Sequence, residues 1–237
     1  MSSTARTRTP RRSGRSRSSS PTCDRSAAAA SSTPRPLTGA VLTSERSREP
    51  PVALILASRS PQRRAILEQL GIPFSVVPTD VEEISTGKPE RVAVENARRK
   101  ALAGAATASG PPVLGVDTVV ALNGEIHGKP ADRAAARRVL EVLSGQRHLV
   151  VSGLAVAREG REPQTAVEIT AVDFRPLEPG LLDWYLASGE WRERAGGYAI
   201  QGRGAALVRR IEGDYLNVVG LPVVALLELL PGLLRMR

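Results

Sequence analysis

The sequence lacks several residue types on which common kinds of protein function depend. It contains one cysteine, Cys23, and two histidines, His127 and His148, among 237 residues. An intrachain disulfide is therefore impossible, and a zinc site built from cysteine and histidine is effectively excluded. A catalytic thiol is not expected either, because we expect the segment around Cys23 to be disordered. Any metal ion would be bound by oxygen ligands, which favours Mg²⁺ or Mn²⁺.

Long apolar runs are absent as well. No stretch approaches the length of about 18 consecutive apolar residues that a transmembrane helix needs. The N-terminal segment has no apolar region of the kind that a secretory signal contains. Hydrophobic residues still make up 41% of the chain, which is sufficient for a core. These features predict a folded cytoplasmic protein that does not enter a membrane.

Most of the positive charge lies at the N-terminus. The chain carries a net charge of +9, and residues 1–50 hold ten arginines against three acidic residues, so residues 51–237 carry only +2. A broad nucleic-acid surface on the folded part is therefore not expected. Residues 1–50 are rich in Arg, Ser and Pro and contain no aromatic residue, which predicts a disordered extension. This extension could be a tail that binds polyanions, a transit-like peptide or a segment without function, and we favour the last.

Residues 51–237 alternate between apolar strands and amphipathic helices, as in a single domain. Strands are expected at residues 52–57, 74–77, 113–116, 148–157, 164–174 and 206–211, and helices at 61–70, 89–108, 132–143, 181–188 and 222–230. Asn123 and Gly124 indicate a hairpin turn, and Asn217 and Pro222 are expected to organise a turn before the last helix. Helices that alternate with strands, interrupted by hairpins, predict an α/β fold with a mixed sheet.

The stretch LILASRSPQRR, residues 54–64, joins the first strand to the first helix. Ser60 fits the N-cap and Pro61 fits the first helical position. Arg63 and Arg64 are unfavourable to the helix dipole, and a phosphate bound at the helix N-terminus would remove that penalty. These residues taken alone are equally typical of a capped helix with a solvated basic first turn.

Three further motifs could serve phosphate chemistry. Asp117 and Thr118 follow an apolar strand, where ligand-binding groups gather in α/β sheets, so Asp117 is a candidate general base, metal ligand or turn residue. Glu83 belongs to the acidic sequence PTDVEE, which could bind Mg²⁺ with substrate phosphates or form a solvated loop. Lys129, in a Gly-Lys-Pro sequence, could contact a phosphate, although no P-loop motif is present.

The glycine-rich residues 196–204 include Gln201, whose amide could read a base edge, although the stretch could also be a simple turn. Lys100, in the helix sequence NARRKA, would ordinarily be a surface lysine, and His148 is interpreted as structural. No single motif decides the function. Together they supply anion donors, hard-cation ligands and a candidate base reader, a combination that suits nucleotide phosphate chemistry.

The order of these motifs resembles the Maf family of nucleotide pyrophosphatases. The motifs run from about residue 52 to residue 230 and read LASRSPQRRAILEQLGIPF, DVEE, RRKA, GVDTVV, GKP, LSGQRH, EWRERAGGYAIQGRGAALV and GDYLNVVGLP. The resemblance implies an inosine-triphosphate-pyrophosphatase-like fold, with a bent mixed sheet, flanking helices and two lobes around a cleft. It also implies hydrolysis of nucleoside triphosphates to monophosphate and pyrophosphate with a divalent cation, namely Mg²⁺, Mn²⁺ or Co²⁺. The sequence YAIQG resembles the subgroup that acts on dTTP, UTP and modified pyrimidine nucleotides.

The resemblance also assigns roles to individual residues. Asp117 matches the family's proton acceptor and a metal ligand. The other matches are Ser58, Arg63, Lys100 and Lys129 for phosphate binding, Glu83 for metal binding, and Gln62, Thr118 and Gln201 for substrate choice. Three motifs depart from the family pattern: Gln62 replaces the first arginine of SPRR, GADT is here GVDT, and Arg194 replaces the lysine of DKAG. Gln62 bears on base preference more than on catalysis.

The resemblance leaves one alternative function open, a nucleotide-binding regulator of cell division or septum formation with little turnover. The intact set of Asp117, Glu83, Lys100 and Lys129 favours catalysis over this alternative. A nucleoside triphosphate is the expected partner, and a homodimer is expected from the family resemblance alone.

Overall fold

The computed structural model describes residues 53–234, and the expected disordered extension at residues 1–50 lies outside them. In chain order the elements are β1 (Leu54–Ala57), α1 (Pro61–Gln69), β2 (Phe74–Val76), α2 (Pro89–Ala105), β3 (Val113–Leu122), β4 (Glu125–His127), α3 (Arg133–Leu143), β5 (Arg147–Arg158), β6 (Arg161–Phe174), α4 (Pro179–Ser188), η1 (Ala195–Gly197), η2 (Arg203–Leu207), β7 (Val208–Glu212), α5 (Tyr215–Val219) and α6 (Val223–Leu229). None of the described helices is long and apolar enough to cross a membrane.

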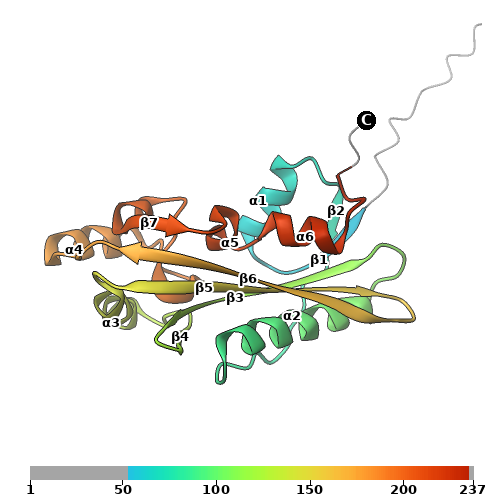
Figure 1. Cartoon of the computed structure of the whole chain (residues 1–237), viewed down its shortest axis with the longest axis horizontal. Coiled ribbons are helices and arrows are strands. Elements are labelled where there is room, and N and C mark those ends of the chain that lie inside the picture. The colour runs from blue at the N-terminus through green and yellow to red at the C-terminus, as the bar shows by residue number, and fades with distance from the viewer. Residues whose placement is uncertain (1–52, 235–237) are drawn as a thin grey trace, which may run out of the picture. The chain divides into compact units, whose positions relative to one another are not determined.

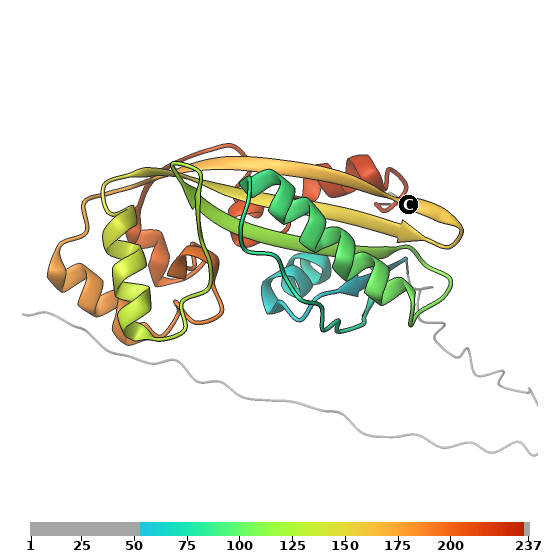
Figure 2. The same cartoon turned by 90° about the horizontal axis from the view of Figure 1, so that it is seen from below.

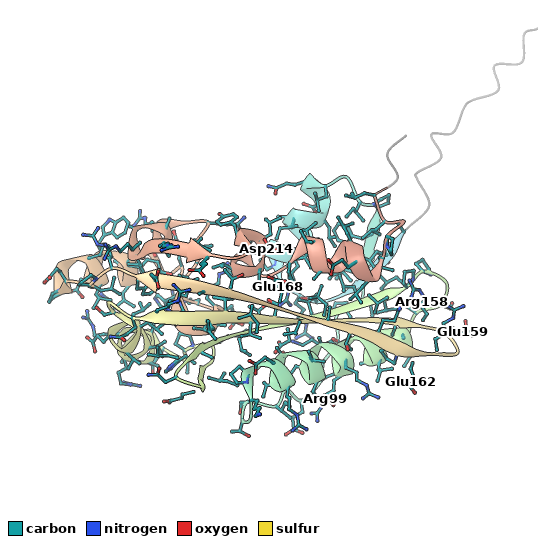
Figure 3. The ribbon with its side chains drawn as sticks, in the orientation of Figure 1. Arg99, Arg158, Glu159, Glu162, Glu168 and Asp214 are labelled. Atoms are coloured by element: carbon teal, nitrogen blue, oxygen red, sulfur yellow. The ribbon has the colours of Figure 1, made fainter. Side chains whose placement is uncertain are left out.

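The described strands form one mixed sheet with the order β2-β1-β3-β5-β6-β7, and β4 pairs with β3 outside this order. β1 is parallel to β2 and β3, whereas the pairs β3–β5, β5–β6 and β6–β7 are antiparallel. The long strands β3, β5 and β6 extend along the sheet (Figure 1). The charged residues Arg158, Glu159 and Glu162 lie at the β5–β6 turn, at the tip of this long hairpin (Figure 3). The predicted α/β fold with a mixed sheet and flanking helices is confirmed.

Different helices cover the two ends of the long strands. α1, α2 and α6 lie over one end and α3 and α4 lie at the other (Figures 1 and 2). Each end has an apolar cluster of its own, one that includes Leu67 and Leu226 and one that includes Leu140 and Tyr185. We call these ends the α1 half and the α3 half, and they correspond to the two lobes expected from the sequence.

α2 lies close against the sheet because glycines occupy the strand positions beneath it. A Cβ atom at Gly115 would be 2.1 Å from the carbonyl oxygen of Ala97, and a Cβ atom at Gly153 would be 2.3 Å from that of Ala93. Close-packed interiors do not accommodate such contacts, so any side chain at either position would push the helix away. This contact brings the polar residues on the same face of α2 to the surface of β3.

β3 and α5 differ from the elements that the sequence predicts. β3 continues unbroken through Asp117 and Thr118, where we expected the strand to end. The strand continues because both side chains find polar partners on either side of the sheet. Asn217, expected to organise a turn together with Pro222, lies in the short helix α5, where it is buried and donates to the carbonyl oxygen of Val150 at 3.0 Å.

His148 lies in the core of the α3 half. Its Nε2 is 3.0 Å from the hydroxyl of Tyr198, and its ring meets Phe174 edge to face with centroids 4.8 Å apart. Burial is the main cause that lowers the pKa of His148 to about 4, so the ring is neutral near pH 7. This placement agrees with a structural role for His148.

Candidate active site

A gap in strand pairing along one edge of β3 opens a cleft. β1 pairs with β3 up to Gly115, and β4 pairs with it only from Val120 onward. The intervening residues pair with β5 alone, so this edge of β3 is free. A cleft of about 410 Å³ lies here, and it is lined by all the predicted site residues except Gln201: Ser58, Gln62, Arg63, Glu83, Lys100, Asp117, Thr118 and Lys129.

Gln201 is exposed and lies in the turn between η1 and η2, outside the cleft lining. Tyr198, from the same glycine-rich stretch, does line the cleft. A carboxylate from Glu190 packs against this turn, since a Cβ atom at Gly202 would lie 2.4 Å from its Oε2. Base reading by Gln201 therefore stays a prediction.

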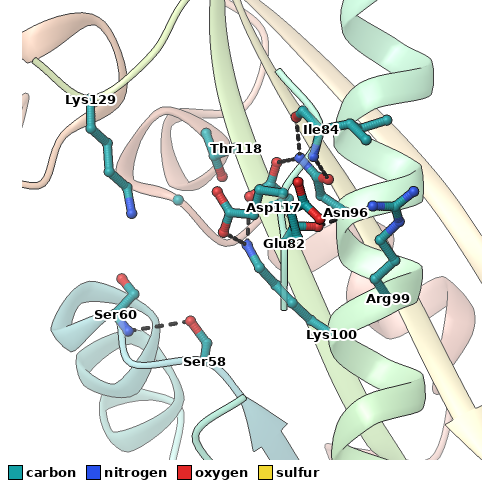
Figure 4. A network of polar contacts seen from close by, with 12 residues as sticks. Ser58, Ser60, Glu82, Ile84, Asn96, Arg99, Lys100, Asp117, Thr118 and Lys129 are labelled. Carbon is teal, nitrogen blue, oxygen red and sulfur yellow. Dashed lines mark hydrogen bonds and ion pairs between the residues drawn. The ribbon is translucent and has the colours of Figure 1, made fainter. Parts of the chain in front are cut away.

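Asp117 lies in a cluster of charged residues at the free edge of β3 (Figure 4). The Nζ atom of Lys100 is 2.7 Å from Oδ1 of Asp117 and 2.6 Å from Oε1 of Glu83. The side chain of Lys100 is only 12% exposed. Lys100, predicted to bind phosphate, thus also joins the two carboxylates that were predicted to bind metal.

Asn96, which the sequence analysis missed, completes this cluster. Its Nδ2 donates to Oδ2 of Asp117 at 3.0 Å and to the carbonyl oxygen of Ile84 at 2.9 Å, and its Oδ1 accepts from the N–H of Ile84 at 2.8 Å. Arg99 supports the same loop by donating to the carbonyl oxygen of Glu82 at 3.0 Å (Figures 3 and 4). Asn96 therefore fixes both the Asp117 carboxylate and the loop that precedes α2.

The sequence does contain a signal for Asn96. It lies one helical turn before Lys100, on the face of α2 that carries Ala93 and Ala97, because residues three or four apart share a helix face. An asparagine on a buried face requires hydrogen-bond partners. We call Asp117, Asn96, Lys100 and Glu83 the α2 wall of the cleft.

Thr118 faces the opposite side of the sheet from Asp117, because consecutive strand residues alternate. There its hydroxyl is 3.2 Å from Nη2 of Arg63 and 2.9 Å from the hydroxyl of Ser152. Arg63 is 9% exposed and also donates to Oγ of Ser58 and to the carbonyl oxygen of Gly220, both at 2.9 Å. Burial is the main cause that lowers the pKa of Arg63, although an arginine stays charged in proteins. Arg63 thus ties α1, β3 and the end of α5 together beside the cleft.

The N-terminus of α1 borders the cleft without a side-chain cap. Ser60 occupies the N-cap position and Pro61 the first helical position, as predicted, but no side-chain oxygen caps the helix. The hydroxyl of Ser60 instead donates to Oε1 of Gln62 at 3.1 Å, while its N–H donates to Oγ of Ser58 at 3.2 Å. The first-turn N–H groups therefore remain available to an anion in the cleft.

Residues near η1 form the opposite side of the cleft. Nζ of Lys129 lies 3.6 Å from Oε2 of Glu193, and their side chains are 55% and 83% exposed. Glu193 has a φ of 57°, an uncommon backbone conformation for a residue other than glycine. Arg194 donates a hydrogen bond to Oε1 of Gln62. We call Lys129, Glu193 and Arg194 the η1 wall.

The α2 wall fits a hard divalent cation. Oxygens of Asp117 and Glu83 already converge on one cationic atom, Nζ of Lys100. Within residues 53–234 no group of three or more His, Cys, Asp or Glu side chains is placed to hold a metal ion. Mg²⁺ is commonly held by one or two carboxylates together with substrate phosphates, so a two-carboxylate site suits it. Glu83 and Asp117 would hold the ion together with phosphate oxygens.

The fold and the site together describe an α/β protein whose cleft gathers acidic and basic side chains at a free strand edge. The model of the family described as Maf-like protein matches residues 53–233, and the chain belongs to this family. The membership expected from the sequence motifs is therefore confirmed.

Two relatives are nearly half identical in sequence to this chain. A dTTP/UTP pyrophosphatase of Symbiobacterium thermophilum is 46% identical over 179 residues, which cover 75% of this chain and 92% of the relative. A second dTTP/UTP pyrophosphatase, from Moorella thermoacetica, is 48% identical over 180 residues, which cover 75% and 93%. The solved structure of a HAM1 protein from Coxiella burnetii is 21% identical, covers 65% of this chain and 90% of that chain, and aligns with a TM-score of 0.40.

Proposed function

We propose that the protein is a nucleoside triphosphate pyrophosphatase that converts dTTP, UTP and modified pyrimidine nucleotides to nucleoside monophosphate and pyrophosphate. The names and high identity of the relatives support this function. The main structural support for the proposal is the α2 wall, where Asp117 accepts hydrogen bonds from Lys100 and Asn96 and lines the cleft. The cleft volume of about 410 Å³ suits a small-molecule substrate.

The cleft offers separate positions for the phosphates and for the reaction. The free N–H groups of α1 and the ammonium of Lys129 face the cleft from two sides and suit phosphate oxygens. Lys129 is largely exposed and weakly paired, so its side chain can turn toward a substrate. Charge that develops on the leaving pyrophosphate would be stabilised by such cations.

Asp117 accepts a proton from the water molecule that attacks the α-phosphorus. The bond between this phosphorus and the bridging oxygen breaks, and pyrophosphate leaves with the bridging oxygen. Hydrogen bonds from Lys100 and Asn96 fix the Asp117 carboxylate, which reduces the reorganisation needed during the reaction. A divalent cation held by Glu83 and Asp117 would supply positive charge to the phosphate oxygens and acidify a bound water.

Asp117→Asn tests the proposal, because it keeps the shape of the side chain and removes the proton acceptor. We expect pyrophosphate release to fall at least about a thousandfold, within the range for loss of a general base. The measurement is pyrophosphate release from dTTP, UTP, CTP, ATP and GTP with Mg²⁺, Mn²⁺ and Co²⁺, together with the melting temperature. Asp183→Asn is the matched control, since Asp183 is exposed and lies outside the cleft lining, and it should retain most activity.

Near-normal turnover by Asp117→Asn would overturn the proposed mechanism. A wild-type protein that binds nucleotides but releases pyrophosphate from none would instead favour the regulator of cell division. The cytoplasmic location and the homodimer remain predictions, and sedimentation velocity would test the dimer.

A further inference from the structure

Gln62 and Arg194 meet across the cleft from different halves of the molecule. Gln62 lies in the first turn of α1, and Arg194 precedes η1, 132 residues further along the chain. Nη1 of Arg194 donates to Oε1 of Gln62, and the hydroxyl of Ser60 donates to the same oxygen at 3.1 Å. Both Gln62 and Arg194 line the cleft.

These two contacts determine the orientation of the Gln62 amide. A guanidinium group has N–H donors and no acceptor, so the atom that it meets must be the amide oxygen. The amide nitrogen of Gln62 then lies on the other side, and it has no hydrogen-bond partner within residues 53–234. Because Oε1 already accepts two hydrogen bonds, the amide N–H groups are the atoms of Gln62 that remain to bond a ligand in the cleft.

Arg194 is itself held in place by burial. Its Nε is buried and has no hydrogen-bond partner in the described part of the chain. Burial is the main cause that lowers its pKa, while Tyr185, Glu190 and Glu193 oppose this effect. Arg194 is therefore directed toward Gln62 by its surroundings rather than by an ion pair, and an arginine at position 62 would instead place two guanidinium groups in contact.

We propose that Arg194 is a positioning residue for base selection. It orients the Gln62 amide so that the free N–H groups meet O4 of a uracil or thymine base, the ring position at which cytosine carries its amino group. A neutral amide donor suits a neutral carbonyl oxygen, whereas the amino group of cytosine is itself a donor and is rejected. The inference rests on the proposed function, since it deepens the preference for dTTP and UTP.

The test is the affinity for non-hydrolysable α,β-imido analogues of UTP and CTP, measured by titration calorimetry. Arg194→Met should reduce the UTP-to-CTP affinity ratio about tenfold, the effect of one hydrogen bond. Gln62→Met should reduce the ratio equally, and the double variant should show no further reduction. Arg194→Lys, which keeps a donor, should recover part of the ratio.

Arg192→Met is the matched control, because Arg192 stacks on Trp191 outside the cleft lining and should leave the ratio unchanged. The inference is overturned if Arg194→Met weakens the binding of both analogues by the same factor, since a structural or phosphate-binding role would affect the affinity for both. Additive effects of Gln62→Met and Arg194→Met would also overturn it, as would equal wild-type affinity for UTP and CTP analogues. Binding of the analogues does not require turnover. The affinity ratios would therefore still test the role of Arg194 if the protein proved not to be a pyrophosphatase.

Discussion

Lys100 and Lys129 face the same cleft from opposite walls, and their surroundings differ. Lys100 is 12% exposed and lies 2.6 and 2.7 Å from two carboxylates of the α2 wall. Lys129 is 55% exposed and lies 3.6 Å from Glu193 of the η1 wall, a carboxylate that is itself 83% exposed. One lysine is locked in place before substrate arrives, and the other is free to move.

This difference separates two tasks within one cleft. Buried charges that are paired and hydrogen-bonded have their geometry fixed in advance, which is what charge stabilisation during a reaction requires. Exposed ion pairs contribute little and exchange easily with solvent or ligand. Under the proposed function we therefore expect the α2 wall to serve the chemical step and the η1 wall to serve substrate capture and choice.

Lys100→Met should have the largest effect among substitutions at the two lysines. The buried carboxylate of Asp117 and the exposed carboxylate of Glu83 would lose their shared cation, and we expect kcat to fall roughly a hundredfold, as on loss of one stabilising donor. Steady-state kinetics on dTTP or UTP would measure the change, with a thermal melt to confirm folding. An effect on KM alone, with kcat unchanged, would contradict a role in the chemical step.

Asn96→Leu should rank next, because it removes the hydrogen bonds that Asn96 makes to the Asp117 carboxylate and to the backbone of Ile84. Loss of such a supporting residue typically costs about 10- to 100-fold in activity or metal affinity. We expect lower kcat and weaker Mn²⁺ binding, the latter measured without substrate by electron paramagnetic resonance. Arg91→Leu, at an exposed position of the same helix, is the control and should change neither value.

Lys129→Met should act on substrate binding rather than on the chemical step. Removal of an exposed cation that contacts a phosphate should raise KM roughly tenfold with little change in kcat. The same kinetic measurement gives both values. If Lys129→Met lowers kcat as much as Lys100→Met does, the distinction between the two walls fails.

Glu193→Gln should have the smallest effect and the opposite direction. The change removes the exposed ion-pair partner of Lys129. We expect KM to fall by no more than about twofold, because surface ion pairs are weak. Rates at several salt concentrations would test this, because added salt should reduce the difference between variant and wild type. A large rise in KM would mean that Glu193 itself contacts the substrate.

The sequence predicts the order of strands and helices well because hydrophobic periodicity is local. Eight of the nine predicted site residues line the cleft, since the motif order identifies the family. Which side chains bond to one another within the cleft depends on contacts between distant segments. Hydrophobic periodicity is a local pattern and does not predict these contacts. Arg63 illustrates this limit, because its buried contacts with Gly220 and Thr118 join segments that are far apart in the chain.

Asp117 and Thr118 show why the local sequence pattern predicted the end of β3 too early. Two polar residues after an apolar run usually mark a turn, and the sequence alone offers no partner for them. In the folded chain one face supplies Asn96 and Lys100, and the other supplies Arg63 and Ser152. The strand therefore continues through a polar pair.

The geometry of the cleft depends on two glycines beneath α2, at positions that no substrate touches. With Gly115 and Gly153 in place, the backbone of α2 lies where a single methyl group could not fit. One added carbon at either position would shift Asn96 and Lys100 together, away from Asp117. We therefore expect both positions to remain glycine during evolution for as long as the α2 wall is under selection.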